Sequence, residues 1–126
     1  MMNLQVCRFS IAFIWLYQGI VPKLLGPHAD ELRMNMALGL NEAQAHLLSY
    51  VGGGMEVVLG LMVWVFYRQR WPYVITIAAL FGLFAFTLFV VPAFTVSAFN
   101  STTVNLAVCS LAVIALAELR VMESGG

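Results

Sequence analysis

The chain is organised around the stretch Gly52-Gly53-Gly54-Met55-Glu56-Val57-Val58-Leu59-Gly60, which places one carboxylate near the middle of the apolar run 46–67. At about 1.5 Å per helical residue, this run can cross a hydrocarbon layer about 30 Å thick, so Glu56 would lie close to the bilayer midplane. An ionised side chain at that depth is costly unless a neighbouring group pairs with it. Gly52, Glu56 and Gly60 are four residues apart and share one helix face, where the small glycines let a second helix approach. The stretch therefore predicts a helix–helix contact in a membrane, with a partner for Glu56 on the neighbouring helix.

The composition also indicates a membrane protein. Of the 126 residues, 62% are hydrophobic and 10% are charged, whereas soluble domains carry about 25% charged residues. A soluble bundle of this size could not bury so much apolar surface. The net charge is zero and the chain has no basic tract, which argues against nucleic acid as a partner.

Four apolar segments are long enough to span a bilayer as helices, and they cover residues of about 4–25, 46–67, 73–91 and 101–122. The first is too long for the apolar region of a signal peptide and has no small-residue cleavage pattern, so we expect it to be retained. The predicted fold is an all-α, polytopic membrane four-helix bundle that forms a single domain over residues 1–126. Pro22 falls in the last turn of the first span and should bend it, and Pro72 suits the first turn of the third span.

An even number of spans puts both termini on the same side of the membrane. The basic residues on that side would be Arg8, Arg68, Arg70 and Arg120, against Lys23 and Arg33 on the other. This excess predicts cytoplasmic N- and C-termini for a multi-pass protein of the cell inner (cytoplasmic) membrane.

The loop between the first and second spans is long enough to hold a short amphipathic helix. Asp30 can cap a helix over residues 31–38, which would stop at Gly39. Its apolar residues Leu32, Met36 and Leu40 recur every four positions. We expect this helix either to lie on the membrane surface or to fold over the mouth of the bundle.

Several side chains of the first and fourth spans could serve Glu56. At 100° per residue, one arc of the first span holds Arg8, Ala12, Trp15, Gly19, Pro22 and Lys23. Arg8 and Lys23 are its cations, and Gln18 lies closer to the depth of Glu56 but to the side of this arc. In the fourth span a polar stripe contains Asn105, whose amide can donate to a carboxylate.

The sequence thus predicts a polar intramembrane centre with candidate binding residues Arg8, Trp15, Gln18, Lys23, Glu56 and Asn105. Glu56 is the candidate proton-exchanging group, and no residue stands out as catalytic. Two interpretations stay open: Glu56 joins helices as a structural ion pair, or it serves a ligand, as intramembrane ionisable residues often do.

Metal and thiol chemistry have little support in the sequence. Cys7 and Cys109 lie in separate apolar runs and form no CxxC pair, so we interpret them as small packing residues. The two histidines are far apart, so no metal site and no covalently bound cofactor are expected.

Three segments carry a resemblance to a known family. These are Arg8 with Ile14-Trp15-Leu16-Tyr17-Gln18-Gly19-Ile20-Val21-Pro22-Lys23-Leu24-Leu25, then Glu56-Val57-Val58-Leu59-Gly60-Leu61, and finally Phe99-Asn100, Thr103 and Asn105-Leu106. They resemble, in order, the first-helix signature, the second-helix motif and the start of the fourth helix of the DoxX-like membrane proteins. The resemblance covers nearly the whole chain and implies a four-helix integral membrane bundle.

The wider DoxX/DoxD group includes small subunits of a thiosulfate:quinone oxidoreductase and components of other membrane redox complexes. The resemblance therefore implies a quinone-interacting or accessory subunit of a membrane oxidoreductase, unlikely to catalyse alone, with quinone as the cofactor. Its partners would be the lipid bilayer and other membrane subunits or further copies of the chain. Two alternatives stay open: a non-catalytic membrane scaffold or assembly protein, and a small-molecule or lipid carrier.

Overall fold

The computed structural model describes residues 2–25, 29–90 and 101–125, and all regular structure in these ranges is helical. The elements are α1 (Met2–Gly19), the π-helical turn η1 (Ile20–Leu24), α2 (Ala29–Met36), α3 (Glu42–Val65), α4 (Trp71–Val90) and α5 (Ser101–Gly125). Residue 91 of the predicted third span and Phe99-Asn100 of the family signature lie outside the described residues. The all-helical fold class is confirmed for the described chain.

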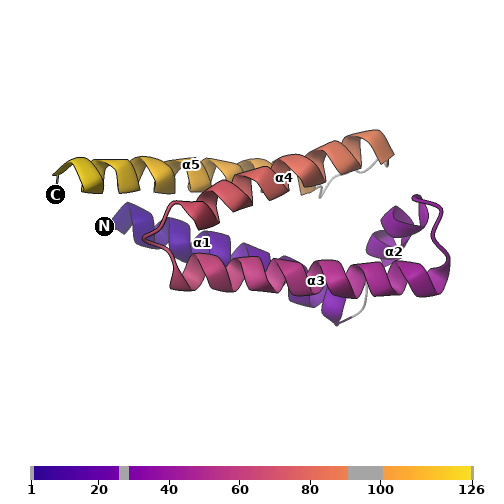
Figure 1. The fold of residues 1–126 in the computed structure, drawn as a ribbon. Coiled ribbons are helices and arrows are strands. Elements are labelled where there is room, and N and C mark those ends of the chain that lie inside the picture. The colour runs from indigo at the N-terminus through magenta and orange to yellow at the C-terminus, as the bar shows by residue number, and fades with distance from the viewer. Residues whose placement is uncertain (1, 26–28, 91–100, 126) are drawn as a thin grey trace.

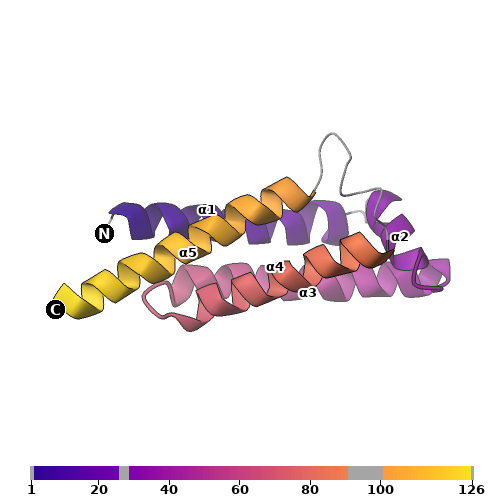
Figure 2. The ribbon, with the colours of Figure 1, turned by 90° about the horizontal axis from the view of Figure 1, so that it is seen from above.

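The long helices form two layers, one of α1 with α3 and the other of α4 with α5 (Figure 1 and Figure 2). α1 packs most extensively against α3 and also contacts α5, which in turn packs against α4. Both termini lie at one end of the molecule and α2 lies at the other (Figure 1). This arrangement agrees with the prediction that the termini share one side of the membrane.

Three of the helices are long and apolar enough to cross a membrane: α3, α4 and residues Thr103–Gly125 of α5. The protein is therefore a membrane protein. The predicted first span is divided between α1 and η1, and the count of four spans stays a prediction. Two helices extend beyond the predicted spans. α3 begins at Glu42, before the predicted start at 46, and α5 continues to Gly125, beyond the predicted end at 122.

The early start of α3 has a local cause. Asn41 is its N-cap, and its side chain accepts a hydrogen bond from the Gln44 backbone N–H at 2.8 Å. The Gln44 side chain accepts in return from the Asn41 backbone N–H at 3.1 Å, which completes a capping box. After the short connection between α3 and α4, Pro72 lies in the first turn of α4, as predicted, and is buried there.

The π-helical turn follows from Pro22. Proline has no backbone N–H, so the Gln18 carbonyl loses its usual partner four residues on, and the ring would clash with that carbonyl in a regular α-helix. The chain widens instead, and the Leu25 N–H donates to the Ile20 carbonyl, five residues earlier, at 2.8 Å. The structure thus shows a one-turn change of helix type around Pro22, where the sequence predicts a bend, and Lys23 lies within this turn.

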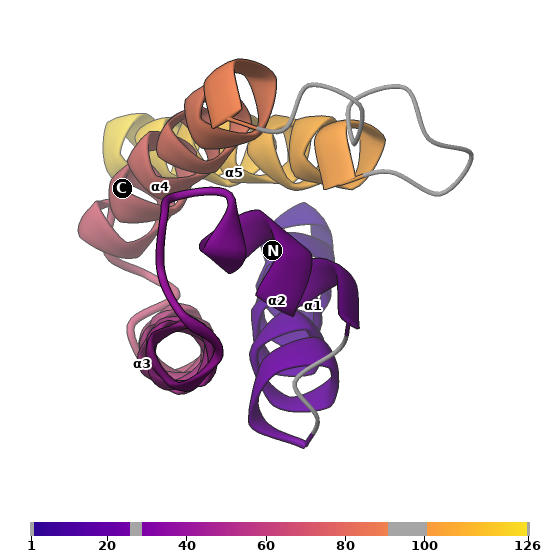
Figure 3. The ribbon, with the colours of Figure 1, turned by 90° about the vertical axis from the view of Figure 1, so that its right-hand side faces the viewer.

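α2 folds over one end of the bundle (Figure 3). The Asn35 amide donates to the Ala45 carbonyl of α3 at 3.0 Å, and Gly39 ends the following turn with a φ of 89°. The helix begins and ends two residues before the predicted range 31–38, and Met36 of the predicted apolar face is 47% exposed. Asn35 is buried against α3 instead. The expected Asp30 cap falls on a side chain outside the described residues.

The core lies where α1, α4 and α5 meet α3 near the terminal end. Its largest buried members include Tyr73, Leu4, Ile11, Val63 and Val108. Cys7 is buried in this core and Cys109 packs against it, both as free thiols, which matches their interpretation as packing residues.

Candidate functional site

The first span packs closely against α3 along a glycine seam, which consists of Gly19, Gly53 and Gly60. A Cβ added at Gly19 would lie 2.7 Å from the Gly53 carbonyl oxygen and 3.1 Å from the Glu56 Cβ. One added at Gly60 would lie 2.9 Å from the Leu16 Cγ. Gly60 therefore makes the predicted close approach. Gly52 does not, because Gly53 takes its place in the seam and a Cβ at Gly52 would meet nothing within 4 Å.

The partner of Glu56 is Lys23, which is one of the two cations that the sequence offered. Lys23 Nζ donates to Glu56 Oε1 in an ion pair, and the two side chains are only 14% and 9% exposed. Glu56 Oε2 is shielded from solvent and has no hydrogen-bond partner among the described residues. Since a carboxylate can accept about four hydrogen bonds, this pair leaves Glu56 with unused acceptor capacity.

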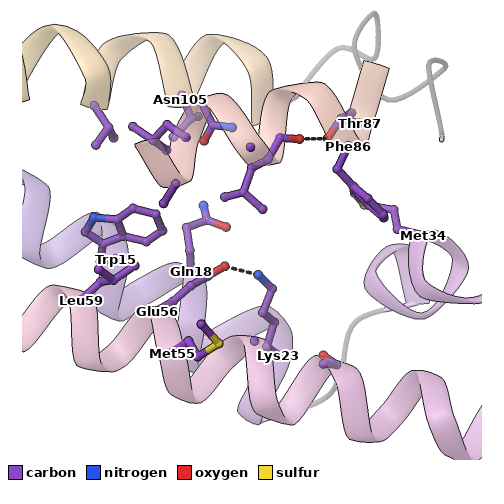
Figure 4. A pocket seen from close by; sticks show the side chains of 18 of the residues that line it. Trp15, Gln18, Lys23, Met34, Met55, Glu56, Leu59, Phe86, Thr87 and Asn105 are labelled. Carbon is purple, nitrogen blue, oxygen red and sulfur yellow. Dashed lines mark hydrogen bonds and ion pairs between the residues drawn. The ribbon is translucent and has the colours of Figure 1, made fainter. Parts of the chain in front are cut away.

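The ion pair lies in the wall of a cavity of about 460 Å³ between the two helix layers. Five of the six predicted binding residues line this cavity, namely Trp15, Gln18, Lys23, Glu56 and Asn105 (Figure 4). α2 borders the cavity with Met34 and Asn35, and α4 contributes the ring of Phe86. Most of the remaining wall is aliphatic, so the cavity combines an apolar interior with a few polar groups, as ligand sites commonly do.

Trp15 is held in place from the opposite layer. Its indole Nε1 donates to the Thr76 hydroxyl of α4 at 3.1 Å, and both side chains are buried. Because the indole N–H is satisfied by the protein, the Trp15 ring offers the cavity an apolar aromatic wall. Gln18 and Asn105 add amide groups, each able to donate and to accept hydrogen bonds.

Arg8 lies elsewhere, toward the terminal end of the bundle. Its Nε donates to the Trp64 backbone carbonyl at 2.9 Å, and its guanidinium lies 4.2 Å and 4.0 Å from the ring centroids of Trp64 and Tyr67. The alternative pairing of Arg8 with Glu56 is therefore not what the structure shows. Arg8 is absent from the cavity wall, since its side chain reaches Trp64 near the end of α3.

Sequence reasoning missed four polar residues of this region, namely Asn35, Ser49, Thr76 and Thr87. Thr76 was overlooked because the third span carries no charge, although a hydroxyl in so apolar a helix was a usable signal. Ser49 was overlooked too: it is 2% exposed, lines the cavity, and its Oγ has no hydrogen-bond partner among the described residues. The signal for Ser49 was its spacing, because Ser49 and Glu56 are seven residues apart on one face of α3.

Within the described ranges, no three His, Cys, Asp or Glu side chains gather where they could hold a metal ion. The site therefore offers a charged pair, several amide and hydroxyl groups and an aromatic wall. These groups can bind and orient an amphiphilic molecule, and the carboxylate can accept a proton or a hydrogen bond.

Comparison with known proteins bears on this arrangement at the level of the family. No curated protein and no solved structure matches the chain. A family model described as DoxX-like family matches residues 12–114, a range that contains Trp15, Gln18, Lys23, Glu56 and Asn105. The match covers most of the sequence, and the chain therefore belongs to the DoxX-like family.

Proposed function

We propose that this protein binds a quinone in the cavity beside Lys23 and Glu56, as a quinone-interacting or accessory subunit of a membrane redox complex. The supporting observation is the cavity itself, which holds a buried ion pair next to apolar and aromatic walls. A quinone has a polar ring and an apolar tail, so its ring suits the polar groups and its tail suits the aliphatic walls and the lipid. Electrons would be exchanged with the ring by a partner subunit, and this chain would bind and orient the ring.

The proposed setting is the inner (cytoplasmic) membrane, with both termini in the cytoplasm. α1 and η1 together would form the first of the four spans, in addition to the three spanning helices α3, α4 and α5. Their residues 2–24 rise about 34 Å at about 1.5 Å per residue, enough for the hydrocarbon layer. Arg70, which is ion-paired with Glu123, lies at the terminal end and supports the positive-inside orientation.

Quinone binding by the purified chain tests the proposal. In lipid nanodiscs, wild-type protein should bind decylubiquinol, the reduced form of decylubiquinone, saturably, and Glu56→Gln and Trp15→Ala should each weaken its binding about tenfold or more. The matched control is Glu123→Gln, because Glu123 is also ion-paired but is exposed and outside the cavity. The proposal fails if binding does not saturate or if the control weakens it as much as Glu56→Gln does.

Activity in the native membrane gives a second test. If Glu56 exchanges protons with a bound quinol, Glu56→Gln should lower quinol-dependent electron transfer without lowering the amount of protein in the membrane. Unchanged electron transfer would remove the proton-exchanging role and leave Glu56 as a ligand-binding or structural group.

One observation is compatible with the scaffold alternative. α4 exposes large aromatic side chains, with Phe81 and Phe89 65% and 82% exposed, and these can contact either lipid or another membrane chain. An assembly role predicts that other membrane proteins co-purify with the chain in mild detergent. A chain that always purifies alone, yet binds quinone, would argue against it.

The carrier alternative uses the same cavity, which would hold a small molecule or lipid during transfer across the membrane. It predicts that reconstituted protein moves a lipid or quinone analogue between the leaflets of a vesicle. Binding without such movement would favour the quinone-interacting role.

A further inference from the structure

One hydroxyl in the cavity wall departs from the usual behaviour of hydroxyls in helices. Serine and threonine inside helices commonly donate to the carbonyl four residues earlier. Thr87 donates to the Leu83 carbonyl and Ser110 to the Leu106 carbonyl, both at 2.9 Å. Ser49 is buried, but its Oγ makes no hydrogen bond with any described residue. An unsatisfied buried hydroxyl destabilises a fold, which points to a ligand as its partner.

Ser49 and Glu56 form a matched pair of such groups. They lie seven residues, or two turns, apart on one face of α3, and both line the cavity. Each has one oxygen that is shielded from solvent and has no partner among the described residues. Contact with a ligand would require Ser49 to turn about χ1 and the Glu56 carboxylate to rotate, because both oxygens are shielded in this structure.

The spacing of the pair suggests the size of the ligand. Seven residues at about 1.5 Å separate the two positions by about 10 Å along the helix axis. Side chains at this separation can each form one hydrogen bond with a ligand whose two polar atoms lie several ångström apart. A six-membered ring with oxygens at opposite positions is a ligand of this kind.

The charge of Glu56 suggests whether the oxidised or the reduced form of the ring binds. As the ion partner of Lys23, the Glu56 carboxylate accepts hydrogen bonds and donates none. The oxygens of a quinone also only accept, whereas the hydroxyls of its reduced form, the quinol, donate. We propose that the cavity binds quinol in preference to quinone, with one hydroxyl donating to Glu56 and the opposite one hydrogen-bonded to Ser49. This inference rests on the proposed quinone-binding function and concerns binding alone.

The test compares both forms on the same protein. Full-length chain in lipid nanodiscs is equilibrated anaerobically with decylubiquinone or decylubiquinol, and the two dissociation constants are measured. Wild-type protein should bind the quinol about tenfold more tightly, because one charge-assisted hydrogen bond is gained. Ser49→Ala should weaken quinol binding about fivefold, and Ser110→Ala, a serine outside the cavity, should leave it unchanged.

The role of Glu56 is tested separately. Glu56→Gln should reduce the preference for quinol to less than twofold, because an amide can also donate to a quinone carbonyl. If this variant does not fold, the dimethyl ether of decylubiquinol takes its place on wild-type protein. The ether has no donor, so it should bind at least tenfold more weakly than the quinol.

The outcomes separate this inference from the proposed function. Equal affinities for quinone and quinol in the wild type would overturn the preference for quinol and leave quinone binding intact. Unchanged quinol affinity in Ser49→Ala would overturn the contact with Ser49. If neither quinone nor quinol binds, the proposed function itself is overturned.

Discussion

Two adjacent glycines of α3 provide a stringent test of the helix seam. A Cβ at Gly53 would lie 2.8 Å from the Gly19 carbonyl oxygen and 2.9 Å from the Lys23 Cβ, whereas one at Gly54 would meet nothing within 4 Å. The backbone carbonyl cannot move without moving its helix, so Gly53→Ala must separate α3 from the first span. Overpacking of this kind costs about 1–3 kcal/mol. Gly54→Ala should instead stabilise the helix by about 0.5–1 kcal/mol.

The two alanine variants should therefore differ in free energy of unfolding by about 1.5–4 kcal/mol, although each adds one methyl group to the same helix turn. Reversible unfolding in mixed micelles of dodecyl maltoside and SDS, followed by circular dichroism, measures this difference. Gly53→Ala should also weaken quinone binding, because it displaces Lys23. A Gly53→Ala protein as stable as Gly54→Ala would refute the close contact between the two helices.

Three further substitutions probe the surroundings of the cavity. Trp15→Phe should cost about 1 kcal/mol or more in unfolding measurements, since it leaves the buried Thr76 hydroxyl without its donor; a cost that persists in the Thr76→Val background would contradict this coupling. Asn35→Ala should loosen α2, because it removes the bond to the Ala45 carbonyl; hydrogen exchange should rise in residues 29–36, and unchanged exchange would show that other contacts hold α2. Arg8→Lys should destabilise the protein by about 0.5–1 kcal/mol through weaker contact with two aromatic rings, and should leave quinone binding unchanged; weakened binding would place Arg8 in the ligand site after all.

Much of this architecture could be predicted from the pattern of apolar residues. A run of 22 apolar residues around one carboxylate requires a membrane helix and a partner for its charge, and the structure supplies both. The shared arc of Trp15, Gly19 and Lys23 on the first span also faces the bundle as expected. Such predictions succeed because they depend on helix geometry and on the cost of a buried charge.

The remaining features depend on how helices cross, which spacing along one helix does not determine. Gly52 and Gly53 differ by 100° around the axis, and only the packing of the first span decides that Gly53 lies in the seam. The sequence offered both Lys23 and Arg8 as partners of Glu56, and the packed helices bring Lys23 to it while Arg8 reaches Trp64. Ser49 was missed for a related reason, because an unsatisfied hydroxyl becomes visible only when its neighbours are in place.

The location of a bound quinone ring tests the central claim most directly. An azido-quinone can be photoactivated in membranes that contain the protein, and the labelled residues can be mapped by mass spectrometry. Labels should appear on cavity residues such as Trp15, Met55 and Phe86, and excess unlabelled quinone should suppress them. Labels confined to exposed positions such as Phe81 and Phe89, and insensitive to competition, would contradict a quinone site beside Lys23 and Glu56.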